Sequence, residues 1–598
     1  MFGELWAVDF EFNFGNPGEC PRSVCMVGRE LRSGREIRLW RDELLALGQA
    51  PFDTGPRSAL IAYYASAELG CFLELGWPLP TKVIDLFAEH RVETNGRKLP
   101  CGNKLPGALA LRNLAHIDAG EKEAMQQLIL SNPQWTETPP VPPPPETKRL
   151  ILDYCATDAE ALAALWPVME PMIDMPRALL RGRYMAAVAR MERTGVPIDV
   201  PLHQRLVQNW EAIQERLIVE VDRDFQVFDG TTFKRDRFAR YLISNGIAWP
   251  RLRSGALALD EATFEEETRN HPRLRLLYEL RVSLARLRLT DIQIGGGGRA
   301  RCLLSVFRSV TGRNQPSASK FVFGPARWIR GLVREQEGRA LAYIDWGAQE
   351  IAIAAGLSGD ERLAEDYQGD PHLNFAKAVG LIPPDIGKGA LSPDQATIRN
   401  RCKQAVLGIN YGMTEHGLAI KAQTSLREAR ELLRLHRQTY GRFWKWNEST
   451  VTTALFRGEM RAVFGWRMSV GRDANFRSLQ NWPMQANGAE MMRIAAIVAT
   501  ETGIEVCAPV HDAFLISAPI DRIDEDVTKM REIMAKAGRL VTGIEVRTDV
   551  KIVRSPDRYM DERGAPIWNQ VMGLLEQVER NAGDTLAPPP VALTSNPA

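Results

Sequence analysis

The sequence predicts a multidomain protein that combines α/β and α+β domains. Its 598 residues exceed what one hydrophobic core can organise, and this length suggests roughly three to five domains. Hydrophobic residues make up 45% and charged residues 25% of the chain, which is ordinary globular composition. Strand and helix patterns mix in the N-terminal part, a mainly helical stretch follows at 176–290, and short apolar strands return further on.

Composition also excludes some classes of protein. No stretch approaches the roughly 20 uninterrupted apolar residues that cross a bilayer, so no membrane partner is expected. The N-terminus lacks a basic region before an apolar run, so we expect no signal peptide. The eight cysteines lie singly, which favours reduced thiols. The net charge of +1 neither supports nor excludes a nucleic-acid partner, because a basic groove can be hidden in a neutral total.

The chain opens on a short alternating strand, LWAVDFEF. Asp9 and Glu11 are two residues apart on it and therefore point to the same side. The Pro-rich segment 139–147 is expected to be an extended spacer. In the helix that follows, Tyr154 and Asp158 lie one turn apart, and we expect this helix to pack with the opening strand.

The middle of the chain is expected to be helical, because apolar residues recur three and four apart in RLVQNWEAIQERLIVEV. Four glycines at 295–298 indicate a flexible break. Seven arginines lie close together in sequence and form either a solvated helix face or a surface that follows phosphates. They are Arg273, Arg275, Arg281, Arg286, Arg288, Arg299 and Arg301.

Two aspartates end apolar strands that are far apart in sequence. Asp345 ends the strand RALAYIDW, and Asp512 lies where two short apolar segments, EVCAPV and AFLISAP, meet in a hairpin. For either residue alone, a turn or a cap is the more common explanation. Facing each other, the two carboxylates would repel unless a divalent cation lay between them, and hard oxygen ligands favour Mg²⁺.

The segment 395–412 is predicted to be a helix on which Arg399 and Lys403 share a face. Two cations at this spacing repel, so their placement favours a bound polyanion. An exposed basic stripe is the alternative. Gly408 and Gly412 argue against it, because glycines weaken a helix and indicate that something packs closely there, such as a base.

These segments resemble family A DNA polymerases of the bacterial DNA polymerase I kind. RNRCKQAVLGINYG at 399–412 resembles the family's motif B, DWGAQE at 345–350 its motif A, and VHDA at 510–513 its motif C. TGRNQP at 311–316 and FRSLQNWPMQ at 476–485 match two further segments in the same order. Each motif is weak alone, but five in order are a strong signal.

The resemblance implies a DNA-directed DNA polymerase, a nucleotidyltransferase that extends a primer on template DNA with dNTPs. Asp345 and Asp512 would hold two Mg²⁺ ions, or Mn²⁺ in their place, for two-metal phosphoryl transfer. Lys403 would protonate the leaving group. The dNTP-binding residues would be Arg399, Lys403, His372, Glu350 (excluding a 2′-hydroxyl), Leu407 and Tyr411. The DNA-binding residues would be Arg313, Arg477, Asn481 and Gln485 in the minor groove, and His511 near the primer terminus.

The sequence departs from the family in three places. Leu407 stands where the family usually carries Phe or Tyr against the incoming sugar, so we expect poor use of dideoxynucleotides. Ala513 replaces the usual Glu after the motif C aspartate, which removes an auxiliary carboxylate. GGGGRARC at 295–302 departs from a family stretch before the palm.

The N-terminal region resembles an RNase H-like 3′→5′ exonuclease of the DEDD type, which would proofread. Tyr154 would orient the attacking water. Two Mg²⁺ ions would bind to the carboxylates of Asp9, Glu11, Glu68 and Asp158. Glu68 stands where Asp is usual and Tyr64 where Asn is common, so a polymerase with a decayed exonuclease is an alternative. Activity is favoured, because all four acidic positions keep a carboxylate.

The architecture implied is a right hand beside the exonuclease domain. Its segments are 1–170 exonuclease, 176–300 thumb and helical connection, 301–370 palm, 371–455 fingers, 456–562 palm again, and 563–598 a disordered tail. ARELLRLHRQTYGRFWKW is expected to be one amphipathic helix. The layout, with no 5′-nuclease domain, resembles phage or prophage members, acting in the cytoplasm of a bacterial host cell on DNA replication. The sequence names no accessory replication protein.

Two alternatives belong to other functional classes. One is a nuclease whose polymerase half only holds DNA, and the other is a non-catalytic protein that binds primer-template DNA. Intact Asp345, Asp512, Arg399 and Lys403 argue against both. A single-subunit RNA polymerase is disfavoured by Glu350 and the exonuclease module.

Overall fold

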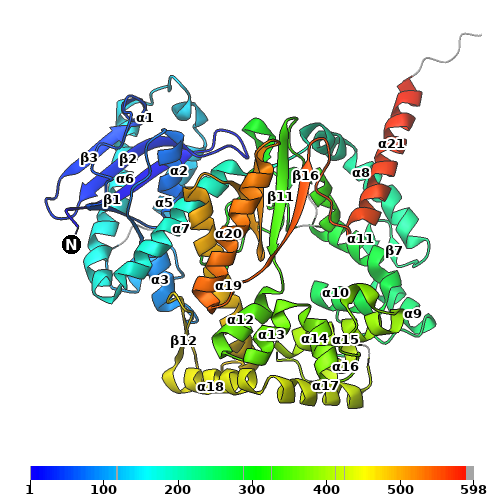
Figure 1. Ribbon diagram of the computed structural model, residues 1–598. Coiled ribbons are helices and arrows are strands. Elements are labelled where there is room, and N and C mark those ends of the chain that lie inside the picture. Colours follow the sequence, from blue (N-terminus) through cyan, green and yellow to red (C-terminus); the bar gives the residue numbers. More distant parts are fainter. Residues whose placement is uncertain are drawn as a thin grey trace, which may run out of the picture. The chain divides into compact units, whose positions relative to one another are not determined.

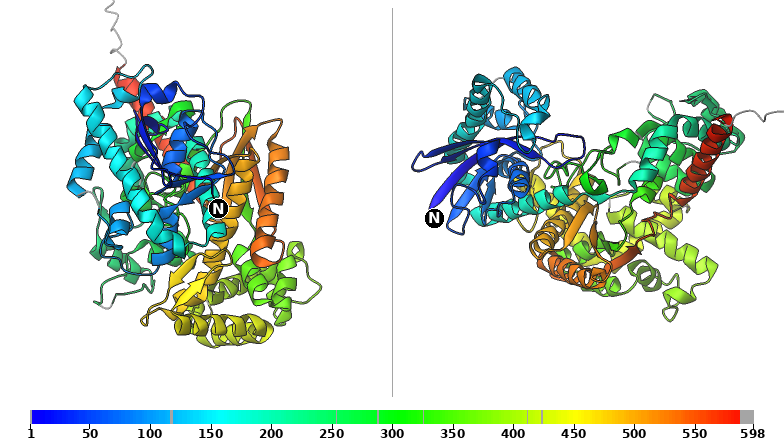
Figure 2. Two further views of the ribbon diagram at one scale, coloured as in Figure 1. Left: turned by 90° about the vertical axis from the view of Figure 1, so that its left-hand side faces the viewer. Right: turned by 90° about the horizontal axis from the view of Figure 1, so that it is seen from above.

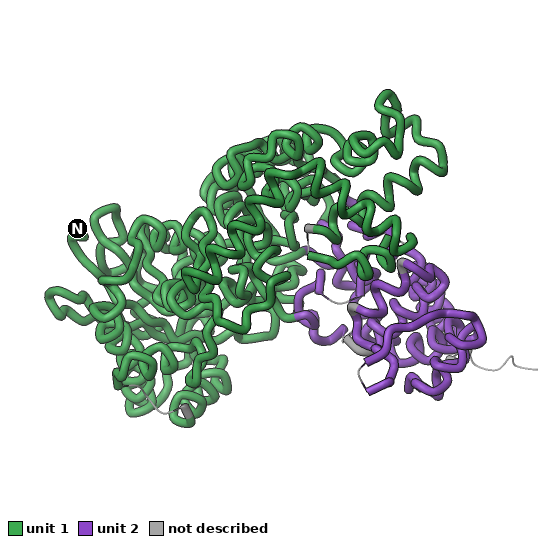
Figure 3. The backbone as a smooth tube through the Cα atoms, turned by 90° about the horizontal axis from the view of Figure 1, so that it is seen from below, with its two compact units in different colours: residues 1–196, 294–317, 336–554 green, residues 197–293, 318–335, 555–598 purple. Residues whose placement is uncertain are grey.

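The structure is a computed structural model (Figures 1 and 2). It describes residues 2–115, 119–252, 254–286, 289–324, 326–410, 412–422 and 424–586. Contacts divide the chain into two compact units (Figure 3). Unit 1 comprises Met1–Val196, Ile294–Ser317 and Gln336–Arg554, and unit 2 comprises Pro197–Gln293, Ala318–Glu335 and Ser555–Ala598. Among the described residues, no helix is both long enough and apolar enough to cross a membrane.

Unit 1 begins with a five-stranded mixed sheet in the order β3-β2-β1-β4-β5 (Figure 1). Its strands are β1 (Glu4–Asn13), β2 (Arg22–Glu30), β3 (Glu36–Trp40), β4 (Ser58–Ala62) and β5 (Val83–Asp85). β1 pairs antiparallel with β2 and parallel with β4. The helices around this sheet are α1 (Arg41–Leu45), α2 (Ser66–Glu74), α3 (Leu86–Thr94), α4 (Leu105–Ala110), α5 (Ala119–Leu130), α6 (Pro145–Met169) and α7 (Met175–Thr194).

The alternation of β1 decides which side chains meet α6. Trp6, Val8 and Phe10 share a core with residues of α2 and α7. Leu5 and Ala7 share a different core with Leu162, Leu165 and Trp166 of α6. Since strand side chains alternate, Asp9 and Glu11 continue the α6 side. The expectation that the opening strand, β1, packs against α6 is confirmed (Figure 2).

A second, four-stranded antiparallel sheet of unit 1 has the order β14-β15-β11-β16. Its strands are β11 (Arg339–Trp346), β14 (Glu505–Val510), β15 (Ala513–Pro519) and β16 (Thr548–Arg554). The long helices α19 (Phe476–Glu501) and α20 (Ile523–Thr542) pack against it (Figure 1). The expected strand ending near Asp345 and the hairpin at His511–Asp512 are both confirmed.

A helical region follows β11 in unit 1. It contains α12 (Gln349–Ser358), α13 (Glu361–Gln368), α14 (Pro371–Ala378), α15 (Pro393–Asn410), α16 (Glu415–Lys421), α17 (Leu426–Thr439) and α18 (Gly441–Arg457), with the β12 (Glu459–Arg461) and β13 (Arg467–Ser469) hairpin after them. The single amphipathic helix expected at 429–446 is wrong. Tyr440 leaves the helical conformation (φ −114°, ψ 53°) and separates α17 from α18. Its buried hydroxyl bonds Asp366 Oδ2 at 2.8 Å, which holds the break in place.

Unit 2 is mainly helical. Its elements are α8 (Val200–Asp222), β7 (Phe228–Asp229), β8 (Thr232–Phe233), α9 (Arg235–Ser244), α10 (Glu261–Asn270), α11 (Arg275–Arg286) and α21 (Ala565–Leu586). The disordered tail expected at 563–598 is wrong for the part that forms α21. Trp568, Val571 and Leu575 of this helix are buried, because apolar residues recur there at helical spacing. Residues 587–598 lie outside the described residues.

The four glycines expected to be a flexible break form a tight hairpin instead. β9 (Ile294–Gly295) pairs antiparallel with β10 (Arg299–Ala300). A Cβ at Gly295 would lie 2.2 Å from the carbonyl oxygen of Gly18, so close packing requires glycine there.

Several of the seven arginines between positions 273 and 301 contact other residues of the chain. In unit 2, Arg281 lies 4.2 Å from the ring centroids of both Phe233 and Phe264. In unit 1, Arg301 donates to the carbonyl oxygens of Arg193 and Gly18. The side chain of Arg286 and all of Arg288 lie outside the described residues.

Candidate active sites

The first site lies at one end of the four-stranded sheet. Asp345 is near the end of β11, and Asp512 lies in the turn between β14 and β15. The backbone amide of Trp346 donates to the carbonyl oxygen of Asp512 at 3.2 Å, which fixes the two strand ends together. Asp345 Oδ1 is buried and has no hydrogen-bond partner among the described residues. Such an orphaned carboxylate oxygen is suited to a cation.

A third carboxylate flanks this pair. In the sheet register, Asp345 stands opposite Ala513 on one side and Asp549 of β16 on the other. Residues directly opposite in an antiparallel pair project on the same face. Burial, followed by the charges of Asp512 and Asp549, raises the pKa of Asp345 to about 8. Asp549 was not predicted, because only the strand register brings it to this place.

A cationic group lies on α14 and α15. Arg399 of α15 binds Asp370, the N-cap of α14, with 2.5 Å between Nη2 and Oδ2. Burial lowers the pKa of His372 to about 4; Asp370 opposes this shift, and Lys403, Arg399 and Arg547 add to it. The expected residues Arg399, Lys403 and His372 are therefore neighbours. The sequence analysis did not predict Arg547 as a member of this group.

Arg547 links this cationic group to the end of β11. A Cβ built on Gly347 would lie 3.2 Å from the Arg547 side chain. The guanidinium lies 4.9 Å from the ring centroid of Tyr367 and donates to that residue's carbonyl oxygen at 2.9 Å. The aspartates and the cations thus border one region of unit 1.

The remaining predicted polymerase residues surround this region. Glu350 is half-buried near the start of α12, and Leu407 is half-buried on α15. His511 is exposed, with a positive φ of 57°, just before Asp512. Arg477, Asn481 and Gln485 recur every four residues on α19 and so share a face. Tyr411 lies outside the described residues.

Arg313 lies beside the α19 helix. A Cβ on Gly488 of α19 would lie 3.6 Å from Arg313 Nη2 and 2.8 Å from Gln349 Oε1. Arg313 therefore lies next to the start of α12, which carries Glu350.

The two glycines of motif B pack against protein atoms. A Cβ on Gly408 would lie 3.1 Å from Met413 Sδ, and one on Gly412 would lie 2.7 Å from Gln480 Oε1. The expectation that something packs closely there is confirmed. In this structure the neighbours are side chains of the chain itself.

The second site lies beside the first sheet. Oxygen atoms of Asp9, Glu11 and Asp158 all lie within 4.8 Å of one another, an arrangement that can hold a metal ion. These residues line a cleft of about 1060 Å³ together with Glu68 and Tyr154. All five predicted exonuclease residues are therefore brought together.

Burial dominates the electrostatics of this cleft. It raises the pKa of Asp9 to about 8, with the charge of Asp158 adding to the effect and Lys122 opposing it. Burial and the charge of Asp9 also raise the pKa of Glu68. Glu68 Oε2 is buried without a hydrogen-bond partner among the described residues. Residues that are costly to ionise and face one cleft favour bound cations.

Lys122 of α5 is a functional candidate that the sequence did not indicate. Its Nζ lies 2.5 Å from Asp158 Oδ2. A single lysine on an ordinary helix carries no pattern, so only the fold reveals this contact.

Asp85 supports the segment that carries Glu68. Its carboxylate accepts from the backbone amides of Tyr64 and Ala65, each at 3.1 Å, and also caps α3. Tyr64 has a positive φ of 74°, which is uncommon for a non-glycine residue and is held here by Asp85.

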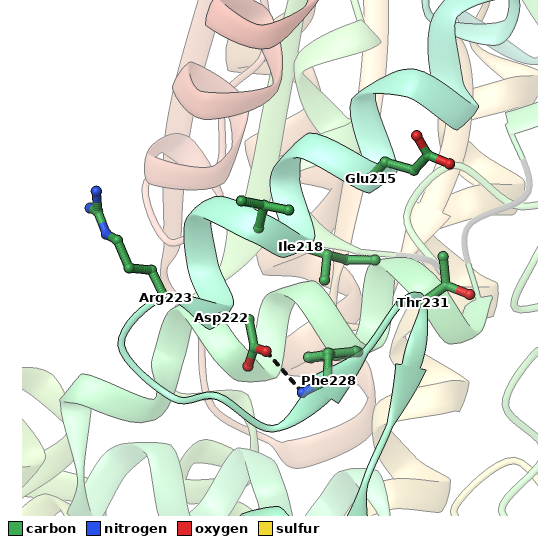
Figure 4. A pocket seen from close by; sticks show the side chains of 8 residues that line it. Glu215, Ile218, Asp222, Arg223, Phe228 and Thr231 are labelled. Atoms are coloured by element: carbon green, nitrogen blue, oxygen red, sulfur yellow. Dashed lines mark hydrogen bonds between the residues drawn. The ribbon is translucent and has the colours of Figure 1, made fainter.

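Unit 2 has a smaller hollow of about 440 Å³ between the end of α8 and the β7–β8 hairpin (Figure 4). Asp222 is its central carboxylate, but its oxygens accept from the backbone amides of Val227 and Phe228 at 2.6 and 2.9 Å. The hollow contains none of the predicted site residues.

Comparison with known proteins finds a family match. Residues 325–557, which contain Asp345, Arg399 and Asp512, match the model of DNA polymerase family A, so this part of the chain is similar to that family. This match covers the four-stranded sheet and the helices that follow β11.

Individual relatives agree with this match. DNA polymerase I, thermostable, of Thermus thermophilus is 28% identical over 392 residues, covering 60% of this chain and 45% of the relative. DNA polymerase I of Aquifex aeolicus is 22% identical over 445 residues, covering 67% and 74%. The chain spans about half the length of the Thermus relatives it matches.

A solved structure shares the fold of this chain. The POL domain of Pol1 from M. smegmatis, in complex with DNA primer-template and dNTP, is similar with a TM-score of 0.68 and 18% identity. The similarity covers 92% of this chain and 95% of that chain. At this identity it shows the fold alone.

Proposed function

We propose that this chain is a DNA-templated DNA polymerase that extends a primer 3′-hydroxyl with dNTPs. The observation that carries the proposal is the buried oxygen of Asp345, which has no hydrogen-bond partner among the described residues and lies beside Asp512, in a region bordered by Arg399, Lys403 and His372. The family match over residues 325–557 and the primer-template and dNTP in the similar Pol1 complex support it.

Asp345 and Asp512 fit divalent metal ions, because an ionised carboxylate pair at this depth needs a cation. Two bound Mg²⁺ ions would supply positive charge to the 3′-hydroxyl and the triphosphate during phosphoryl transfer. Arg399 and His372 would hold triphosphate oxygens, and Lys403, which is exposed, would give a proton to the pyrophosphate leaving group. Arg399 would exchange the Asp370 carboxylate for phosphate oxygens.

The other predicted residues would select the substrates. Glu350 would exclude a 2′-hydroxyl, and Leu407 would face the sugar. Arg313 and the α19 residues Arg477, Asn481 and Gln485 would donate to minor-groove acceptors that all base pairs share. His511 would lie near the primer terminus, and Tyr411 near the templating base.

We further propose that the N-terminal site is a 3′→5′ exonuclease. Asp9, Glu11, Glu68 and Asp158 would bind divalent metal, and Tyr154, which lines the same cleft, would orient water. The conjunction of all four carboxylates in one cleft supports activity over decay.

The first test is primer extension on a labelled primer-template with Mg²⁺ and dNTPs, comparing the unaltered chain with Asp512→Ala. Extension by the unaltered chain alone supports the polymerase. If the unaltered chain only shortens the primer, the nuclease alternative replaces it. Asp524→Ala is the matched control, since Asp524 is an exposed carboxylate paired with Arg554.

A further inference from the structure

Lys122 is a cation held inside a cluster of carboxylates. Its side chain is 21% exposed and Asp158 is 11% exposed, with the ion pair at 2.5 Å. Asp158 is itself within 4.8 Å of the oxygens of Asp9 and Glu11. The ammonium therefore stands at the Asp158 end of the group, where a metal ion bound by Asp158 would otherwise be expected.

The ion pair brings a positive charge into the cluster. A lysine side chain carries this charge at neutral pH, and the 2.5 Å contact places it on Asp158. The lysine is thus a counter-ion that compensates part of the negative charge.

Glu68 has no such cation among the described residues. It is 5% exposed, and its Oε2 has no hydrogen-bond partner there. Asp9 is the carboxylate that acts most strongly on Glu68. One divalent ion between these two carboxylates would satisfy both, whereas a second ion beside Asp158 would be repelled by the ammonium.

We propose that Lys122 takes the place of one metal ion, so that the carboxylate cluster binds a single divalent ion, held by Asp9 and Glu68. The inference deepens the proposed exonuclease and rests on it for its meaning. An ammonium has three protons, of which one serves Asp158. The others are available to the phosphate of a DNA strand in the cleft, a role that a second metal ion would otherwise have.

The test counts Mn²⁺ ions bound to the full chain by electron paramagnetic resonance, with the other site removed by Asp345→Asn and Asp512→Asn. The unaltered cluster is expected to bind one ion and Lys122→Met to bind two. Lys122→Arg keeps the charge and is expected to bind one. Lys104→Met is the matched control with one ion, because Lys104 lines the same cleft and is exposed.

Two ions in the unaltered cluster would overturn the inference even if Lys122→Met failed to fold. A single ion in a folded Lys122→Met would also overturn it. Shortening of a single-stranded oligonucleotide is measured in parallel, with the palm aspartates intact. If the count rises from one to two but no variant shortens DNA, the ion count stands and the exonuclease proposal fails.

Discussion

At the scale of residues, the two carboxylate sites compensate their charge differently. Asp345 has two acidic neighbours, Asp512 and Asp549, and an orphaned oxygen. Asp158, by contrast, already has an ammonium. Among the described residues, Asp345 has no such ion pair, whereas a lysine of the chain itself balances part of the charge at the second site.

Leu407 is expected to make the polymerase discriminate strongly against dideoxynucleotides. An aliphatic side chain has no group that replaces the hydrogen bond of a missing 3′-hydroxyl, whereas Leu407→Tyr supplies one. A hydrogen bond of about 1 kcal/mol corresponds to roughly fivefold better dideoxynucleotide use in the variant. Single-nucleotide incorporation measures the ratio of dideoxynucleotide to deoxynucleotide use. Efficient chain termination by the unaltered chain at equimolar dideoxynucleotide would contradict this expectation.

Glu68→Ala is expected to slow removal of a mismatched primer terminus by at least roughly tenfold while leaving extension intact, since it removes a metal-facing carboxylate. Gel analysis of a mismatched primer without dNTPs measures the rate. Glu123→Gln is the control, because Glu123 is exposed and lines the same cleft. An unchanged rate in Glu68→Ala would refute the role of Glu68.

The resemblance to a DEDD exonuclease predicted which carboxylates meet, and strand alternation by itself predicted only that Asp9 and Glu11 point to the same side. Neither the resemblance nor the periodicity predicted that Lys122, Asp549 or Arg547 lies at a site. These three reach their sites through tertiary packing and strand register, which one sequence does not display.

At the scale of elements, α14 is joined to α15 through its cap. The Asp370 carboxylate accepts from the backbone amide of Leu373 at 3.0 Å and also pairs with Arg399. Asp370→Ala removes both contacts, whereas Asp370→Asn keeps an oxygen for the cap. Loss of the cap costs about 1 kcal/mol, so we expect roughly fivefold faster hydrogen exchange at the start of α14 in the Ala variant and less than twofold in the Asn variant. If hydrogen exchange were equally fast in the two variants, the ion pair with Arg399, and not the cap, would be what stabilises the start of α14.

The junction of α17 and α18 is expected to weaken in acid because of His436. Its ring is 1% exposed, and burial lowers its pKa to about 3. Below pH about 6.5 the unfolded chain binds a proton that the folded chain refuses, so the stability is complete above that pH and is lost on acidification. At pH 4.5 the loss from this residue is about 2–3 kcal/mol.

His436→Phe tests this, because the ring packs among Phe375, Tyr440 and Phe443. Thermal melting between pH 7.5 and 4.5 should show a smaller decline in the variant than in the unaltered chain. Parallel declines would show that other groups cause the acid sensitivity.

Element types were predictable where apolar periodicity is strong, as in α8, but element ends were not. The helix break at Tyr440 depends on a side-chain bond to Asp366, and the glycine hairpin depends on the approach of Gly18. Both are tertiary causes. α21 was missed for a different reason: the proline-rich end of the chain obscured the helical pattern that precedes it.

At the scale of the whole molecule, the N-terminal sheet and the four-stranded sheet belong to one compact unit, although the sequence predicts two domains. A polar clasp of Arg91, in α3, and Asn95, just after this helix, joins the N-terminal region to segment 307–310 and to β13. Arg91 donates to the carbonyl oxygens of Phe307 and Arg308. Asn95, which is fully buried, donates to those of Val310 and Arg467, each at 2.7 Å. The two sheets are therefore expected to unfold together.

Asn95→Ala should separate their unfolding. The variant loses both donations and the bond that Asn95 Oδ1 accepts from Arg91, at a cost of roughly 2–4 kcal/mol. Differential scanning calorimetry should show a single transition for unit 1 in the unaltered chain and an additional one at lower temperature in the variant. Asn16→Ala, at an exposed position, controls for loss of an amide. If the variant melts in one unshifted transition, the clasp does not couple the two sheets, and their joint unfolding must rest on the apolar core between α2, α7 and α19.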